Sequence, residues 1–268
     1  MMRVEASSDL TIGIATSRQE IIRAQTLRYR VFYEDMGAIP SPSVKALGRD
    51  HDVFDDYCDH LIVVDRARSA AGDPCVVGTY RLLRKSVAQA HNGYYSANEF
   101  DLDALKYYPG EHVELGRSCV DRDYRGKAIM QLLWRGIADY IVEHNISLMF
   151  GCASFPGTDL GQMASALSFL HHQNKAPEEW CPRAHASQYV AMNVKEENSV
   201  DFRTAMREMP ALIKGYMRVG GVIGDGAVVD HAFNTTDVCL LVETVNITGK
   251  YQRHFLENRL PEPASFAV

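Results

Sequence analysis

A short basic turn, Asp121 to Lys127 (DRDYRGK), has residue types and spacing that suggest phosphate binding. It stands between residues 112–120, a pattern typical of a β-strand, and a helical pattern that begins at Ala128. The first backbone N–H groups of a helix have no partner within the helix, and the helix dipole adds partial positive charge there. A basic turn with a glycine at that position is therefore a candidate anion site.

The local charge favours the same interpretation. Residues 114–136 carry five basic side chains against three acidic ones, in a chain of formal net charge −6. A solvated surface loop explains the same residues, and the pattern alone gives the two interpretations about equal weight.

A second group of charged residues lies earlier in the chain. The segment Arg49 to Asp59 (RDHDVFDDYCD) holds five aspartates. It is a solvated acidic loop, a calcium site or a site for a cationic substrate. The spacing lacks the glycine and terminal glutamate of an EF-hand, which disfavours calcium.

The elements that must position these groups alternate between strands and helices. Ser17 with Glu20 predicts a capping box at the start of a helix, and a second helix begins at Ala128. Apolar runs predict strands over residues 10–15, 61–65, 75–83, 112–120, 148–155 and 238–245. We expect one mixed α/β domain over 1–268, with a core of about 10–172, an extended C-terminal half of about 173–256 and a loose tail, 257–268.

Composition narrows the class of protein. Hydrophobic residues make up 46% of the chain, enough for a sizeable core, and the net negative charge disfavours general nucleic-acid binding. The six cysteines form no CxxC pair and no zinc spacing, so we expect reduced thiols; we also expect no metal site. No apolar run approaches a membrane span and no signal peptide is visible, so we expect a cytoplasmic protein.

The basic turn resembles the donor-binding motif of the GCN5-related N-acyltransferases (GNAT), Arg/Gln-x-x-Gly-x-Gly/Ala. The matching residues run from Arg125 through Gly126, Lys127, Ala128 and Ile129 to Met130. Two of them depart from the motif: Ala128 stands where glycine is usual, and Met130 where glycine or alanine is usual. The resemblance implies a central mixed, twisted sheet flanked by helices. In that family the loop amides hold the pyrophosphate of coenzyme A; the bulkier residues here favour the single phosphate of acyl carrier protein's phosphopantetheine.

Three further groups resemble, in order, the signature residues of acyl-homoserine-lactone synthases. They are Arg28-x-x-x-Phe32, Asp50-x-Asp52-x-x-Asp55 and Glu114-x-x-Arg117. Asp50 stands where that family has glutamate, and its tryptophan after the first motif is absent. The resemblance makes a synthase that consumes S-adenosylmethionine an alternative function.

From about Leu27 to about Phe255 the chain resembles another branch of the GCN5-related N-acyltransferases. These are the ornithine N-acyltransferases of ornithine-lipid synthesis, also known as hemolysin-like proteins. The most specific matches are the stretches 27–32, 58–61, 77–83, 114–119 and 132–136, with 214–218, 224–226 and 233–237 downstream. The resemblance implies transfer of a 3-hydroxy fatty acyl group from acyl carrier protein to the α-amine of ornithine, giving a lyso-ornithine lipid. Lysine or glutamine as acceptor, and a non-catalytic carrier-binding protein, remain alternatives.

The same resemblance assigns roles along the strand and turn. Glu114 is the candidate base, and a backbone amide near Cys119 or Val120 is the candidate partner of the thioester carbonyl. Strict alternation would place Glu114 and Arg117 on opposite faces, so we expect a β-bulge near Gly116 to change the phase. An ion pair between Glu114 and Arg117 is the alternative structural role.

The remaining candidates concern the donor, its carrier and the acceptor. We expect the phosphopantetheine to contact Cys119, Arg125, Gly126, Lys127 and Ala128, and Arg122 with Arg135 to meet the acidic carrier protein. An acidic pair suits a second ammonium group and an arginine suits the α-carboxylate. The acceptor candidates are Arg28, Asp52, Asp55, Arg81, Arg117 and Ser154. We expect no tightly bound cofactor, and an amphiphilic product makes transient contact with the inner-membrane surface an expectation.

Overall fold

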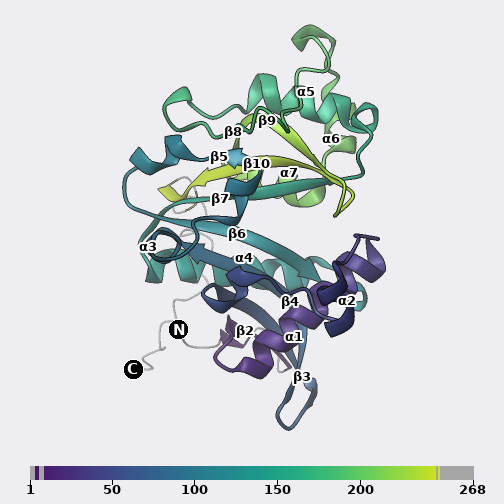
Figure 1. The fold of residues 1–268 in the computed structure, drawn as a ribbon, viewed down its shortest axis with the longest axis vertical. Helices are drawn as coiled ribbons and strands as arrows, with labels where there is room; N and C mark the ends of the chain where they lie inside the picture. The colour runs from purple at the N-terminus through teal and green to yellow at the C-terminus, as the bar shows by residue number, and fades with distance from the viewer. Residues whose placement is uncertain (1–3, 6–8, 246, 248–268) are drawn as a thin grey trace, which may run out of the picture.

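A single ten-stranded sheet organises the computed structural model, which describes residues 4–5, 9–245 and 247 (Figure 1). The pairs β6–β7 and β8–β9 are parallel, and the other neighbouring pairs are antiparallel. The mixed sheet flanked by helices is therefore confirmed. In spatial order the strands are β1 (Val4–Glu5), β2 (Leu10–Ile14), β3 (Asp59–Ala70), β4 (Asp73–Arg84), β6 (Glu111–Val120), β7 (Ile146–Pro156), β10 (Thr235–Glu243), β9 (Val222–Asp230), β8 (Arg183–Ala184) and β5 (Phe100–Asp101).

Two helices cover opposite faces of the N-terminal half of the sheet (Figure 1). Helix α1 (Arg18–Tyr29) begins with the predicted Ser17–Glu20 capping box and continues as a π-helical segment, Arg30–Asp35. Helix α4 (Lys127–Glu143) follows the basic turn, as predicted. Strand β3 shows why both are needed, because Leu61 packs on the α4 side and Ile62 on the α1 side.

The C-terminal half of the sheet is also covered on both faces. Helices α5 (Ala164–Gln173), α6 (Phe202–Glu208) and α7 (Ala211–Arg218) lie on the α4 side. Residues 94–108 and 176–189 cover the other side, where Phe100 packs on Phe150 and Leu241. Two shorter helices, α2 (Pro42–Leu47) and α3 (Lys85–Ala90), belong to the N-terminal half.

Much of the segment 173–210, expected to be a flap or a helical insert, is irregular apart from β8 and α6. The expected end of order near Tyr251–Leu256 and the tail 257–268 lie outside the described residues. No helix in the described ranges has the length and apolarity needed to cross a bilayer.

The expected bulge is present in β6. Strand β4 pairs through Arg81 with Gly116 and through Thr79 with Cys119, so β6 carries one extra residue between these pairs. Arg117 has a φ of 50°, in the left-handed region that residues with a side chain seldom adopt. The extra residue reverses the alternation: Leu115 packs on the α4 side, whereas Cys119, four residues later, packs on the α1 side.

The parallel pair β6–β7 comes apart just before the bulge. Register pairs join Glu111 to Ile146 and continue to Glu114 with Phe150, and the described pairing ends there. Gly151 follows at once, and a Cβ on it would lie 2.2 Å from the carbonyl oxygen of Leu115. A glycine is therefore needed for the strands to approach this closely at the point where they separate.

We expect Gly151→Ala to destabilise the protein by about 1–3 kcal/mol, because the new methyl group must push two backbones apart. Urea unfolding of the variant measures this loss. Gly116→Ala is the matched control, since a Cβ on Gly116 meets no atom within 4 Å. Equal stability of the two variants would contradict the close approach of β6 and β7.

Candidate active site

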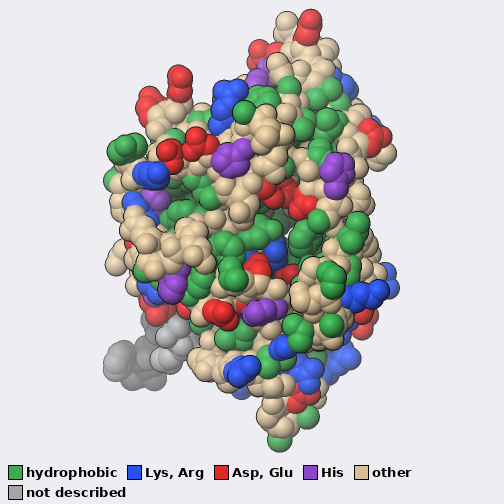
Figure 2. Space-filling model, viewed as in Figure 1, with side chains coloured by type: hydrophobic (Ala, Val, Ile, Leu, Met, Phe, Trp, Pro, Cys, Tyr) green, Lys and Arg blue, Asp and Glu red, His purple; other side chains and the backbone are tan. Residues whose placement is uncertain are grey.

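A cavity of about 240 Å³ lies where β6 and β7 separate. Its size is below that of pockets for drug-sized ligands and suits a small polar molecule. The space-filling view shows a hollow near the middle of this face, with acidic and basic side chains inside it (Figure 2). Its walls include the β6 residues Glu114 to Ser118, the β7 residues Cys152 to Ser154, and Phe233, Thr235 and Asp237.

The cavity reaches through the sheet. Phe32 and Phe233 line it on the α1 side, where their rings pack edge to face. Leu115 and Leu212 line it too, and both pack with the core on the α4 side. The gap between β6 and β7 therefore connects the two faces of the sheet, which allows two reactants to meet from opposite sides.

Glu114 lies at the narrow end of this gap and is 4% exposed. The backbone N–H groups of Tyr95 and Ser96 donate to its Oε2 and Oε1 at 2.8 and 2.6 Å. Burial raises the pKa of Glu114, whereas the hydrogen bonds from Ser96 and Tyr95 lower it, and the net shift is upward. A buried carboxylate with a raised pKa in a cavity is suited to accept a proton near neutral pH.

Arg117 shares the cavity with Glu114 because of the bulge. Its guanidinium lies over the rings of Tyr95 and Phe233, 4.5 and 5.0 Å from their centroids. Its ion pairs run to Asp50 at 3.2 Å and Asp52 at 3.4 Å. Arg117 therefore lies on the same face of β6 as Glu114, as expected from the bulge. Its ion-pair partners are Asp50 and Asp52 and not Glu114, which was the alternative.

The charged residues that resemble the signature of acyl-homoserine-lactone synthases meet beneath the cavity in one buried ion network. Arg28, 0% exposed, contacts Asp50 and Asp55 at 2.8 Å each, and Arg81 contacts Asp52 at 2.6 Å. For Asp50, the guanidinium charges of Arg117 and Arg28 outweigh the effect of burial and hold the pKa below its usual value. The three aspartates and the three arginines, Arg28, Arg81 and Arg117, therefore compensate one another.

The Asp-x-x-Asp spacing has a local structural explanation. Asp52 is the N-cap of a 3-10 helix, Val53–Asp56, and accepts from the N–H of Phe54, while Asp55 accepts from the N–H of Asp52. Neither Asp52 nor Asp55 lines the cavity, and nor does Arg28, although Arg81, Arg117 and Ser154 do. The contacts of Asp52 and Asp55 favour a structural role over the predicted binding of a substrate ammonium.

The predicted donor site lies at the wide end of the gap, where β6 leads into α4. Gly126 is the N-cap of α4, and no side chain caps the helix there. Arg125 and Arg122 reach Asp35 at 2.8 and 3.7 Å while remaining largely exposed to solvent. A helix N-terminus with two exposed guanidinium groups beside it is suited to a phosphate.

The other donor and carrier candidates are dispersed. The Cys119 thiol packs under α1, where burial raises its pKa to about 12, so only its backbone is available to a donor. Val120 ends β6 and packs partly on the α4 side. Ala128 is exposed on the first turn of α4, Arg135 is half-buried two turns on, and the Lys127 side chain is not described.

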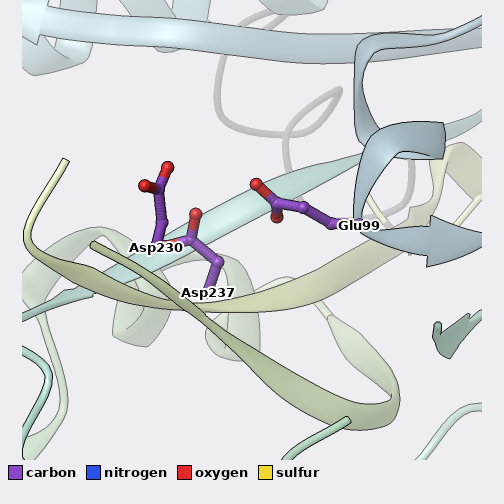
Figure 3. Close-up of side chains that lie close together, drawn as sticks. All are labelled: Glu99, Asp230 and Asp237. Atoms are coloured by element: carbon purple, nitrogen blue, oxygen red, sulfur yellow. The ribbon is translucent and has the colours of Figure 1, made fainter. Parts of the chain in front are cut away.

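Sequence analysis missed a cluster of carboxylates, of which Asp230 and Asp237 line the cavity and Glu99 lies beside them. Glu99, Asp230 and Asp237 come from three separate segments, and their carboxylates point toward one another with oxygens within 4.8 Å (Figure 3). Residues 233–237 were part of a resemblance, but no local pattern assigned them a role. Their approach depends on the pairing of β9 with β10 and on the segment that carries Glu99.

The fold is that of an acyltransferase, because the acetyltransferase (GNAT) domain family matches residues 27–135. The L-ornithine N(alpha)-acyltransferase of Agrobacterium fabrum strain C58 is 46% identical over 249 residues, covering 92% of this chain and 85% of the relative. Proteins of the same name from Rhizobium meliloti and Rhodobacter capsulatus are 44% and 41% identical, covering 92% and 91% of this chain and 84% and 93% of those relatives. The chain therefore belongs to the L-ornithine N(alpha)-acyltransferase family.

We expect Arg28→Met to destabilise the protein by about 3–5 kcal/mol, because it removes the guanidinium that contacts the buried Asp50 and Asp55 at 2.8 Å each. Denaturant unfolding measures the change. Arg23→Met is the matched control on the same helix: Arg23 pairs with Asp73 in solvent, so its loss should leave the midpoint nearly unchanged. Similar midpoints for both variants would mean that the buried network contributes little.

Proposed function

We propose that this protein transfers a fatty, 3-hydroxylated acyl group from acyl carrier protein to the α-amine of ornithine. The observation that carries the proposal is the cavity at the separation of β6 and β7. It places Glu114 and Arg117 together beside a gap whose wide end leads to the N-terminus of α4. The names of the relatives support ornithine as acceptor, and the acyl type follows from the resemblance.

The acceptor end rests on Arg117. A guanidinium that lies over two aromatic rings keeps a defined orientation, and its planar N–H groups suit a carboxylate. We assign the α-carboxylate of the amino acid to this group, with Arg81 behind it and Ser154 on the opposite wall. This places the α-amine toward the gap.

The proposed reaction is a direct transfer. The neutral α-amine attacks the thioester carbon, a C–N bond forms and the C–S bond breaks. Glu114, directly or through water, takes the proton that the amine loses. The phosphopantetheine sulfur leaves as a thiolate and takes up the proton from Glu114. A backbone N–H near Cys119 or Val120, on the separated part of β6, stabilises the oxyanion.

The donor end is assigned to the α4 N-terminus. We propose that the amides of Gly126, Lys127 and Ala128 and the side chain of Arg125 bind the phosphopantetheine phosphate. Exposed Arg122 and the partly exposed Arg135 would meet the acidic carrier. We also propose that the reaction takes place in the cytoplasm, that no tightly bound cofactor takes part, and that the amphiphilic product brings the protein to the inner-membrane surface transiently.

Acyl transfer by the purified protein tests the proposal. 3-Hydroxyacyl carrier protein would be supplied with ornithine, lysine, glutamine or S-adenosylmethionine in turn, and the products read by mass; 3-hydroxyacyl coenzyme A replaces the carrier in a parallel series. We expect acyl-ornithine with the carrier-bound donor. A lysine or glutamine product would change the acceptor, and a lactone would support the homoserine-lactone synthase alternative. Binding of the carrier without any product would indicate the non-catalytic alternative.

We expect Glu114→Gln to lower kcat by about 10²–10⁴-fold, because the amide cannot accept the amine's proton. The raised pKa of Glu114 gives the sign of the pH dependence: wild-type kcat falls as pH falls through it, because the base must be ionised. The variant should lose this acidic limb. Stopped assays across pH measure both effects, with thermal unfolding to check that the Tyr95–Ser96 segment stays in place. An unchanged kcat in a folded variant would remove Glu114 from the mechanism.

A further inference from the structure

The carboxylate cluster of Glu99, Asp230 and Asp237 has no counter-charge of its own. No lysine or arginine in the described part of the chain forms an ion pair with any of the three. This contrasts with the aspartates beneath the cavity, each of which contacts a guanidinium. Three neighbouring carboxylates without a cation repel one another, so they are costly unless a cation binds or they take up protons.

Two buried polar atoms beside the cluster also lack partners. Asp237 is 6% exposed and Thr235 is 4% exposed, and both line the cavity. Asp237 Oδ1 and Thr235 Oγ1 have no hydrogen-bond partner of good geometry, although the Ser154 and Thr235 hydroxyls lie close enough to Asp237 to lower its pKa. They stand two residues apart on β10 and so face the same side of the sheet. Unmet acceptors at the wall of a cavity indicate a ligand that donates hydrogen bonds.

The ionisation of the cluster agrees with that geometry. Burial, followed by the charge of Asp237, raises the pKa of Glu99 to about 7. Burial raises the pKa of Asp237 to about 6, although the neighbouring hydroxyls of Ser154 and Thr235 lower it. A cation placed between them would favour the ionised forms, so the cluster is poised to respond to one.

We propose that Glu99, Asp230 and Asp237 bind the side-chain ammonium of the amino-acid acceptor and thereby select a diamino acid. This deepens the proposed function and rests on it. An ammonium group has three donors and no acceptor, which matches three carboxylates. Arg117 at the other wall would take the α-carboxylate, so the two ends of the molecule meet opposite charges.

The distances are compatible with such an acceptor. The two amines of ornithine are joined by five bonds of ~1.5 Å, which span about 6 Å when extended. The cluster lies on β9 and β10, and β10 pairs directly with β7. Neighbouring strands are about 4.8 Å apart, so an α-amine at the β6–β7 gap places the side-chain ammonium near β10.

A divalent metal ion is the other occupant that the cluster's chemistry allows. Hard cations take six or more oxygen ligands, but several oxygens here are already engaged. Asp230 Oδ1 accepts from the N–H groups of Ala232 and Phe233, and the Cys152 thiol donates to Glu99 Oε2 at 3.2 Å. The remaining acceptors suit an ammonium better than a complete metal shell.

Calorimetric binding tests the proposal without relying on turnover. Norvaline is ornithine without the side-chain amine, so the ratio of the two affinities measures what the ammonium contributes. We expect the wild type to bind ornithine at least about tenfold more tightly than norvaline. Asp237→Asn should abolish this preference while leaving norvaline binding in place. Asp225→Asn is the matched control, because Asp225 lies on β9 and pairs with Lys175 and Arg183.

Each outcome decides the proposal. Equal wild-type affinities for ornithine and norvaline, or a preference that survives in both Asp237→Asn and Glu99→Gln, would overturn it. Binding of Mn²⁺ alone that Asp237→Asn abolishes, with no ornithine preference in the wild type, would assign the cluster to a metal. Should the wild type prefer ornithine yet form no acyl-ornithine from 3-hydroxyacyl carrier protein, the proposed reaction would fail while the ammonium site stands.

Discussion

The one-residue bulge in β6 is the constraint on which the rest of the site depends. In a regular strand Arg117 would point into the core under α4, and a guanidinium there would have no partners. The bulge turns it into the cavity, over two aromatic rings and beside two aspartates. The bulge also lies where β6 and β7 cease to pair. The gap between the two strands and the charged group at its wall, Arg117, therefore occur at the same point of β6.

Two sets of buried charges around the cavity follow opposite rules. Beneath it, aspartates and arginines are matched, and the pKa values of Asp50 and Asp52 lie below their usual range. In the carboxylate cluster, Glu99 and Asp237 are unmatched and have raised pKa values. The matched set fixes Arg81 and Arg117 in place, whereas the unmatched set retains capacity for a cation from outside. In our account, the matched carboxylates hold the arginines of the site in place, whereas the unmatched carboxylates bind the acceptor.

The features that could be predicted from the sequence are those determined locally. The Ser17–Glu20 capping box and the strand–turn–helix around Gly126 depend on neighbouring residues, and both are present. The bulge, which the family resemblance implied, is present too. The Asp52–Asp55 spacing was read as an ammonium site, yet their partners, Arg28, Arg81 and Arg117, come from three other segments. The carboxylate cluster was missed because Glu99 sits in an irregular segment and Asp237 in a strand. Only the tertiary fold makes them neighbours.

A crystal structure of the protein with bound ornithine tests the central claim most directly. The account predicts one orientation: the α-carboxylate on the Arg117 guanidinium, the α-amine facing the β6–β7 gap near Glu114, and the side-chain ammonium among Glu99, Asp230 and Asp237. Ornithine bound with its ends reversed, or bound outside the cavity against Asp52 and Asp55, would contradict it.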